Sequence, residues 1–450
     1  MSARNYDVVV IGGGSGGLAA AFRAASYGAK VAMLEPAPLG GTCVNVGCVP
    51  KKAMWLAADL AERIALARNI GFDLPAEPVL AWPTLLERRQ RYISNIHASY
   101  QKRLDETGVV RISSRGHLID ANTVQCEDGT QFRAGHIVIA TGAHPLKPDI
   151  PGAELGGVSD DFFALKSRPD RVALIGGGYI AVELAGVLRA LGSNVTLLVR
   201  GQRLLDRFDA EVSDQLAENL RLQGVELHFG CKVKALQRQG SQVLAKLADG
   251  PDQASFDTVL FATGRGPNTV GLGLEQAGVK LDDKGAIAVD GCQNTSVPGI
   301  YAVGDVTGRV TLTPVAIAAA RRLMDRVLGG QAEAKLDYEN IPSVVFAHPP
   351  LGSVGLSEEE ASKRFKKVST FYSRFRPMLQ SLGQGEVRSL FKMVCAGDEE
   401  KVVGIHLLGE GADEILQGFA VALKAGITRR QMEETVAIHP TSAEEVVLMR

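Results

Sequence analysis

The sequence predicts an α/β protein with two Rossmann-like dinucleotide-binding domains and a C-terminal α+β domain. A glycine-rich strand, turn and helix pattern occurs at residues 6–34 and again at 171–200, and each copy precedes a buried strand that ends in Ala-Thr-Gly. From about Tyr338 onward, short apolar runs alternate with turns and no such motif occurs. The 450 residues, 46% of them hydrophobic, correspond to about three domains.

The composition predicts small-molecule partners. A net charge of −1 gives no electrostatic footprint for nucleic acid or an anionic membrane. No uninterrupted apolar stretch reaches the ~20 residues of a membrane span, and six cysteines do not form a secreted disulfide framework. We therefore expect a cytoplasmic protein without a leader sequence and without nucleic-acid or membrane partners.

The first glycine-rich motif combines an apolar strand at residues 6–11, a turn, a helix that ends at Gly28 and a strand at 30–34. In such a motif one glycine allows the tight turn, one admits a pyrophosphate and one lets helix pack on strand. Glu35, 23 residues after Gly12, can accept hydrogen bonds from ribose hydroxyls. The predicted contacts with this dinucleotide are Gly12, Gly14, Ser15, Gly16, Gly17 and Glu35.

The second motif repeats the first with a strand at 172–175, a helix to about Leu191 and a strand at 194–199. Its small positions are Gly176, Gly178 and Ala181. Two motifs predict two bound dinucleotides. The matching strands 136–142 and 258–264 indicate an internally repeated fold, with an insertion in the first copy.

The remaining elements follow from hydrophobic periodicity. Amphipathic helices are expected at 53–67 and 85–104, joined by a connection at 71–83. Residues 294–305 read as a strand that delivers Asp305 at its carboxyl end, the edge where open α/β sheets bind ligands. The C-terminal domain is expected to contain strands at 344–346, 390–394 and 402–408 and a helix at 414–424.

A cysteine pair lies in the insertion, within the segment Gly40–Lys52. Cys43 and Cys48 have four residues between them, too many for a C-x-x-C zinc or thioredoxin motif, so no metal site is expected. Positions five apart on a helix do not face each other, so a disulfide there needs a distorted turn and is reducible. Two buried free thiols are the alternative, and Cys126, Cys231, Cys292 and Cys395 read as structural thiols.

The whole segment, GGTCVNVGCVPKK, resembles the redox-active segment of the flavin-dependent pyridine nucleotide-disulfide oxidoreductases, most closely the glutathione reductases. The resemblance covers residues 6–450. It implies FAD and NADPH as cofactors, glutathione disulfide as substrate and a homodimer. It also implies an FAD domain at 1–142 with a return segment at 268–338, an NADPH domain at 143–267 and a dimerisation domain at 339–450.

The resemblance also implies catalytic roles. Cys48 would contact the flavin, Cys43 would attack the substrate disulfide, and Lys51 would pair with Glu183 beside the flavin. The segment 439–445 matches the family's base-bearing segment, so His439 of the partner subunit would be the acid and base, oriented by Glu444. Thr441 and Glu444 also satisfy a helix capping box, and both roles could coexist.

Further contacts are implied position by position. Tyr179 would gate the nicotinamide site, with a core aromatic as the alternative. The remaining implied cofactor contacts are Thr42, Cys43, Lys51, Thr141, Gly142, Gly176, Gly177, Gly178, Ile180, Glu183, Gly264, Arg265, Asp305 and Thr313. Tyr100 and Arg321 match substrate-binding positions, whereas residues 376–381 depart from many glutathione reductases and Phe22 stands where some carry arginine.

The electron donor is predicted from the end of the second motif. Val199 occupies the place that corresponds to Glu35, and Arg200 follows it, so a 2′-phosphate would meet a guanidinium in place of a carboxylate. The family's second arginine aligns with Asp206, and we expect Arg203 or Arg207 to substitute, with Arg207 favoured. The alternatives are an NAD-linked dihydrolipoamide dehydrogenase, another reductase of small disulfides, and a non-catalytic flavin redox sensor.

Overall fold

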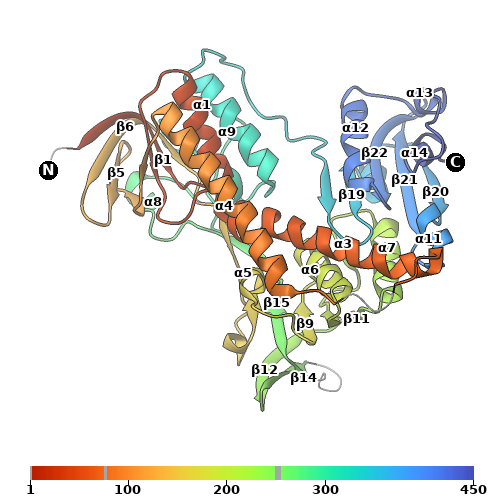
Figure 1. Cartoon of the computed structure of the whole chain (residues 1–450). Coiled ribbons are helices and arrows are strands. Elements are labelled where there is room, and N and C mark those ends of the chain that lie inside the picture. Colours follow the sequence, from red (N-terminus) through yellow and green to blue (C-terminus); the bar gives the residue numbers. More distant parts are fainter. Residues whose placement is uncertain (1–2, 75–78, 249–254) are drawn as a thin grey trace. The chain divides into compact units, whose positions relative to one another are not determined.

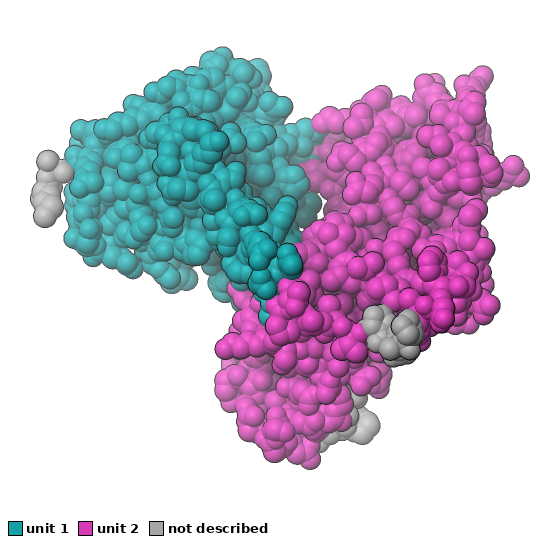
Figure 2. Space-filling view, in the orientation of Figure 1, with its two compact units in different colours: residues 1–51, 86–146, 264–338 teal, residues 52–85, 147–263, 339–450 magenta. Residues whose placement is uncertain are grey.

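The computed structural model describes residues 3–74, 79–248 and 255–450, which fold into two compact units (Figure 1). The first unit contains residues 1–51, 86–146 and 264–338, and the second contains 52–85, 147–263 and 339–450 (Figure 2). Each unit therefore combines segments that lie far apart in the sequence. No helix in the described part of the chain has the length and apolar character needed to span a bilayer.

A seven-stranded sheet forms the centre of the first unit, in the order β3-β2-β1-β6-β5-β4, with β17 paired to β6. The strands are β1 (Arg4–Ile11), β2 (Val31–Leu34), β3 (Val110–Ile112), β4 (Gly116–Leu118), β5 (Thr123–Cys126), β6 (Gln131–Ile139) and β17 (Ile300–Ala302). Strands β3, β2, β1, β6 and β17 are parallel. The segment after residue 299 thus returns to the first sheet.

Both faces of this sheet are buried, which explains the unbroken apolar run of β1. Val8 and Val10 pack in one hydrophobic cluster with α1 (Ser15–Ser26) and α9 (Thr313–Val327). Val9 and Ile11 point to the opposite cluster, which includes Phe132 from β6. The alternation fixes the register of β1 and sets its carboxyl end beside the glycine turn.

The second unit contains a five-stranded parallel sheet in the order β11-β10-β9-β15-β8. Its strands are β8 (Gly157–Val158), β9 (Arg171–Ile175), β10 (Asn194–Leu198), β11 (Glu226–His228) and β15 (Thr258–Phe261). Helices α5 (Ser159–Ala164), α6 (Tyr179–Ala190) and α7 (Ala210–Leu222) accompany it. A small antiparallel sheet follows, formed by β12 (Val233–Gln239), β13 (Gln242–Leu247) and β14 (Ser255–Phe256).

The C-terminal part of the second unit is a five-stranded antiparallel sheet in the order β18-β19-β22-β21-β20. Its strands are β18 (Ser343–Val345), β19 (Leu351–Gly355), β20 (Val368–Phe375), β21 (Ser389–Ala396) and β22 (Lys401–Leu408). The accompanying helices are α10 (Glu358–Arg364), α11 (Met378–Leu382), α12 (Ala412–Lys424), α13 (Arg429–Glu433) and α14 (Glu444–Val447). The predicted fold class is confirmed.

Several predicted boundaries were wrong. The expected strand at 294–305 shortens to β17 (Ile300–Ala302), because Thr295 and Val297 bond back to Ile300 in a turn. Asp305 lies in the 3₁₀ turn η2 (Gly304–Thr307) that follows. The two expected helices are longer, as α3 (Cys48–Ile70) and α4 (Trp82–Thr107), with Pro83 in the first turn of α4. Residues 75–78 of the expected connection lie outside the described residues.

Candidate active site

In both dinucleotide motifs the first glycine lies against the Ala-Thr-Gly strand of the same copy. Gly12 has φ of 110°, and a Cβ there would lie 2.4 Å from the carbonyl oxygen of Ala140. Gly176 has φ of 144°, and its Cβ would lie 2.3 Å from the oxygen of Ala262. Within each copy the glycine turn therefore packs against the Ala-Thr-Gly segment, and only glycine fits at this contact.

The other small residues of the two motifs have two different roles: some are required by close packing, and others leave space for a ligand. A Cβ on Gly17 would lie 1.9 Å from the Gly12 oxygen, and Ala181 in the second copy is fully buried. By contrast, a Cβ on Gly14 would meet only the Cα of Gly41, at 3.9 Å, and one on Gly178 would meet no described atom within 4 Å. These two residues cap α1 and α6, whose N-termini have no side-chain cap. Such open helix ends fit a pyrophosphate.

Polar groups around the first turn are held by backbone contacts. The Glu35 carboxylate accepts hydrogen bonds from the amides of Gly13, at 2.7 Å, and Ala37, at 2.8 Å. Burial raises the pKa of Asp305, and the charge of Arg265 opposes that rise. Arg265 also donates to the carbonyl of Ala143, at 2.6 Å. The amides of Gly13 and Ala37 thus fix the Glu35 carboxylate, which directly follows β2, next to the glycine turn.

The two cysteines lie on different helices. Cys43 belongs to α2 (Gly41–Asn45) and Cys48 begins α3. A Cβ on Gly47 would lie 2.7 Å from the carbonyl of Thr42, so the break between the helices requires a glycine. This break is the distorted turn expected from the spacing.

Both cysteines are free thiols, with Cys43 partly buried and Cys48 exposed. A hydrogen bond with Cys48 raises the pKa of the Cys43 thiol, and burial raises it further. The Cys48 sulfur lies 3.7 Å from Oγ1 of Thr313 at the start of α9. Because Cys43 and Cys48 are hydrogen-bonded to each other, the two sulfurs can share one proton when one of the two thiols is ionised.

The predicted pair of Lys51 and Glu183 is divided between the two units and stays a prediction. Lys51, in the first turn of α3, is 9% exposed. Glu183, in α6, is 5% exposed, and its carboxylate accepts a hydrogen bond from the amide of Phe346 at 2.9 Å. Tyr179, the first residue of α6, is 43% exposed, which argues against the alternative of a core aromatic.

His439 and Glu444 are in contact. Nδ1 of His439 lies 3.0 Å from Oε2 and 3.2 Å from Oε1 of Glu444. Because a carboxylate only accepts, this contact places a proton on Nδ1 and leaves Nε2 to exchange one. Thr441 and Glu444 also form the expected pair of reciprocal hydrogen bonds, both at 3.3 Å, in the turn that precedes α14, whose N-cap is Ala443. The two expected roles of Glu444 are compatible.

The arginines after β10 differ in their partners. Arg203 forms a forked ion pair with Asp214 in α7, at 2.8 and 3.3 Å. Arg200 and Arg207 are exposed, and neither forms a hydrogen bond or ion pair with the residues that the structure describes. The two unpaired guanidinium groups remain available for an anionic ligand.

Sequence reasoning did not identify Arg103 near the expected substrate contacts. Its guanidinium lies 4.6 Å from the ring centre of Phe22, in a cation–π contact. Arg103 is three residues after Tyr100 on α4, so both lie on the same face of the helix. Burial raises the pKa of Tyr100, and the nearby charge of Cys43 adds to that rise. Arg321 is exposed on α9.

These features define a class of dinucleotide-dependent proteins with a reactive cysteine pair. A model of the pyridine nucleotide-disulphide oxidoreductases matches residues 6–320, and a model of their dimerisation domain matches residues 341–450. The chain belongs to this family. A curated glutathione reductase from Schizosaccharomyces pombe is 44% identical over 456 residues, covering 99% of this chain and 98% of that protein. The resemblance read from the cysteine segment is confirmed.

Proposed function

We propose that the chain uses NADPH to reduce glutathione disulfide to two glutathione thiols, with FAD as the bound cofactor. The observation that carries this proposal is the full-length similarity to a glutathione reductase, at 44% identity. The same similarity disfavours dihydrolipoamide dehydrogenase. A non-catalytic flavin sensor is disfavoured because the chain keeps the cysteine pair and the His439–Glu444 contact.

We assign residues 1–142 and 268–338 to FAD binding, 143–267 to NADPH binding and 339–450 to dimerisation. The open N-terminus of α1 at Gly14 and the fixed carboxylate of Glu35 support FAD at the first motif. Bound there, a flavin would accept two electrons from the nicotinamide and pass them on to sulfur. The exposed N-terminus of α6 supports NADPH at the second motif.

The cysteines carry the chemistry on this chain. The thiolate of Cys43 attacks one sulfur of the substrate disulfide and forms a mixed disulfide, and the first glutathione leaves as a thiolate. Cys48 then attacks the Cys43 sulfur, which releases the second glutathione and closes the Cys43–Cys48 disulfide. His439 donates a proton to a departing thiolate, and Glu444 keeps its imidazole oriented.

We infer that His439 acts on the cysteines of the partner subunit in a homodimer. The match of residues 341–450 to a dimerisation domain supports this assembly. We also infer that Arg200 and Arg207 hold the 2′-phosphate, because both are exposed and unpaired among the described residues while Arg203 is held by Asp214. The low cysteine content favours the cytoplasm as the location.

The stoichiometry of the reaction tests this function. Purified protein with FAD bound should produce two thiols from glutathione disulfide for each NADPH consumed. The Cys43→Ser variant is the control, because it should keep FAD and yet produce no thiol. NADPH consumption without thiol release in the wild type would contradict the proposal.

A further inference from the structure

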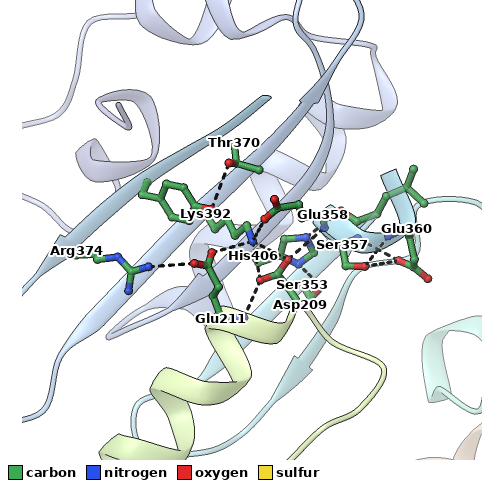
Figure 3. Close-up of polar contacts among 12 residues, drawn as sticks. Asp209, Glu211, Ser353, Ser357, Glu358, Glu360, Thr370, Arg374, Lys392 and His406 are labelled. Carbon is green, nitrogen blue, oxygen red and sulfur yellow. Dashed lines mark hydrogen bonds and ion pairs between the residues drawn. The ribbon is translucent and has the colours of Figure 1, made fainter. Parts of the chain in front are cut away.

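A buried lysine joins the second dinucleotide-binding domain to the C-terminal sheet (Figure 3). Lys392 lies on β21, and its side chain is 1% exposed. Its Nζ lies 2.7 Å from Glu358, 2.9 Å from Glu211 and 3.0 Å from Asp209. Glu358 belongs to α10 of the C-terminal domain, whereas Asp209 and Glu211 lie at the N-terminus of α7 in the nucleotide domain.

Lys392 is the cation of this cluster. Burial lowers the pKa of its amine, but the three carboxylates outweigh that effect and raise the pKa above its usual range. Burial lowers the pKa of the nearby His406, whose Nε2 donates to the carbonyl of Leu356 and whose Nδ1 lies 2.8 Å from the hydroxyl oxygen of Ser353. A buried charge with this many ionic partners holds them in one arrangement.

Asp209 ends the loop that carries Arg200 and Arg207. We define residues 199–209 as the arginine loop, which joins β10 to α7 and contains Arg200 and Arg207. Asp209 caps α7 by accepting from the amide of Glu211, and its other oxygen accepts from the amide of Glu358 at 3.2 Å. The end of the loop is therefore fixed by groups of the C-terminal domain.

The middle of the loop is attached to the glycine turn of the nucleotide domain. The amide of Leu205 donates to the carbonyl of Gly177 at 2.8 Å, and the leucine side chain is 3% exposed. Leu205 has φ of 51°, a left-handed conformation that persists only where the surroundings hold it. The arginine loop is thus held between two anchors, Gly177 and the Lys392 cluster.

We propose that Lys392 is a positioning residue for recognition of the 2′-phosphate. By holding Asp209, it keeps Arg207, two residues earlier, and the rest of the arginine loop in the conformation that binds the phosphate. The C-terminal domain thereby contributes to donor specificity, although none of its residues needs to touch the nucleotide. This inference rests on the proposed use of NADPH.

The test is the Lys392→Met variant of the full-length, FAD-loaded protein, assayed with NADPH and with NADH. We expect KM for NADPH to rise on the order of tenfold, while KM for NADH and both kcat values change little. The reason is that NADH carries a 2′-hydroxyl in place of the 2′-phosphate, so its binding does not depend on an ion pair with Arg200 or Arg207. In an Arg200→Ala/Arg207→Ala background, Lys392→Met should no longer change the ratio of the two KM values.

Two further variants keep the test decisive. Asp209→Asn retains a residue that caps α7 but removes the charge that Lys392 holds, so it should shift the KM ratio in the same direction with less risk to folding. Arg429→Met is the matched control, because Arg429 pairs with Glu400 inside the C-terminal domain and should affect stability without changing the ratio.

The outcomes separate this inference from the function on which it rests. If the wild type prefers NADPH and folded Asp209→Asn keeps the wild-type KM ratio, positioning by Lys392 is wrong and the donor assignment stands. If Arg429→Met shifts the ratio as much as Asp209→Asn does, the effect is general destabilisation and the proposal is overturned. A wild type without preference for NADPH would overturn both.

Discussion

Cys43 and Cys48 occupy different surroundings at a break between two helices. Cys43 is partly buried within α2, and Cys48 is exposed at the start of α3, near Thr313. This asymmetry is compatible with two different roles for two chemically identical groups. It is local to the sequence, because the break lies between the two cysteines and a Cβ on Gly47 there would lie 2.7 Å from the carbonyl oxygen of Thr42.

Replacing Cys43 by serine should stop disulfide reduction and leave flavin reduction by NADPH intact. The loss of turnover should be at least roughly a thousandfold, because the variant lacks the attacking sulfur. Steady-state thiol release and stopped-flow absorbance of the flavin measure the two steps separately. Retained turnover in this variant would assign the attack to another group.

The two roles of Glu444 can be separated by paired substitutions. Glu444→Gln keeps an oxygen that can accept from the amide of Thr441 but removes the negative charge beside His439, so kcat should fall about tenfold with little loss of stability. Thr441→Ala removes the hydrogen bond to the amide of Glu444 and leaves the His439 contact, so stability should fall by about 1 kcal/mol with little change in kcat. Thermal unfolding and steady-state rates distinguish them. If the two variants behave alike, Glu444 has a structural role only.

Some glutathione reductases carry an arginine at the position of Phe22. We expect Arg103 to bind a carboxylate of the substrate in this chain instead. Because its guanidinium rests on the Phe22 ring, Arg103→Gln should raise KM for glutathione disulfide by roughly 10-fold and leave KM for NADPH unchanged. Arg91→Gln on the same helix is the control, because Arg91 pairs with Glu87 on the surface. An unchanged KM in Arg103→Gln would exclude this contact.

At the level of elements, each glycine turn packs against the Ala-Thr-Gly segment at the end of a later strand of the same copy. Gly176→Ala would bring a Cβ within 2.3 Å of the Ala262 carbonyl, so the second turn must open. We expect loss of NADPH binding with FAD retained, measured by nucleotide titration and by the flavin spectrum of the purified protein. Gly178→Ala is the comparison, since its Cβ meets no described atom within 4 Å and its effect reports contact with the nucleotide. Normal NADPH affinity in Gly176→Ala would show that the turn tolerates a side chain.

Elements with strong local signals could be predicted from the sequence, and those defined by distant partners could not. Strands β1, β9 and β15 are short apolar runs that are followed by glycine turns, so they were expected nearly as they are. Strand β20 was missed because Ser369, Thr370 and Ser373 give it little apolar pattern and it is only half-buried. Lys392 interrupts an apolar strand, and its partner Asp209 is 183 residues away in the sequence.

At the level of the whole molecule, neither compact unit is continuous in the sequence. Residues 264–338 belong to the first unit, although residues 147–263, which precede them in the sequence, belong to the second. The repeated Ala-Thr-Gly strands made the two halves recognisable from sequence. Two parts of the site could not be predicted from local sequence patterns. The position of Lys51 relative to Glu183 depends on how the units are arranged, and that of His439 relative to the cysteines depends on how the subunits are arranged.

A homodimer with shared active sites should show complementation. A Cys43→Ser chain reassembled with a His439→Ala chain would form heterodimers with one intact site and one site that lacks both groups. These heterodimers should recover about half of the wild-type activity per dimer. Differently tagged chains allow them to be isolated, and isolated heterodimers without activity would place His439 and the cysteines of one site on the same chain.

The central claim is that NADPH reduces glutathione disulfide on this chain, and the most direct measurement is kcat/KM for crossed pairs of donor and disulfide. NADPH and NADH should each be assayed with glutathione disulfide and with lipoamide, in the wild type and in Arg200→Ala. We predict that kcat/KM is highest for NADPH with glutathione disulfide, by at least about 100-fold over every other pair. Arg200→Ala should lower the ratio of kcat/KM for NADPH to that for NADH. A preference for NADH, or for lipoamide over glutathione disulfide, would contradict this account.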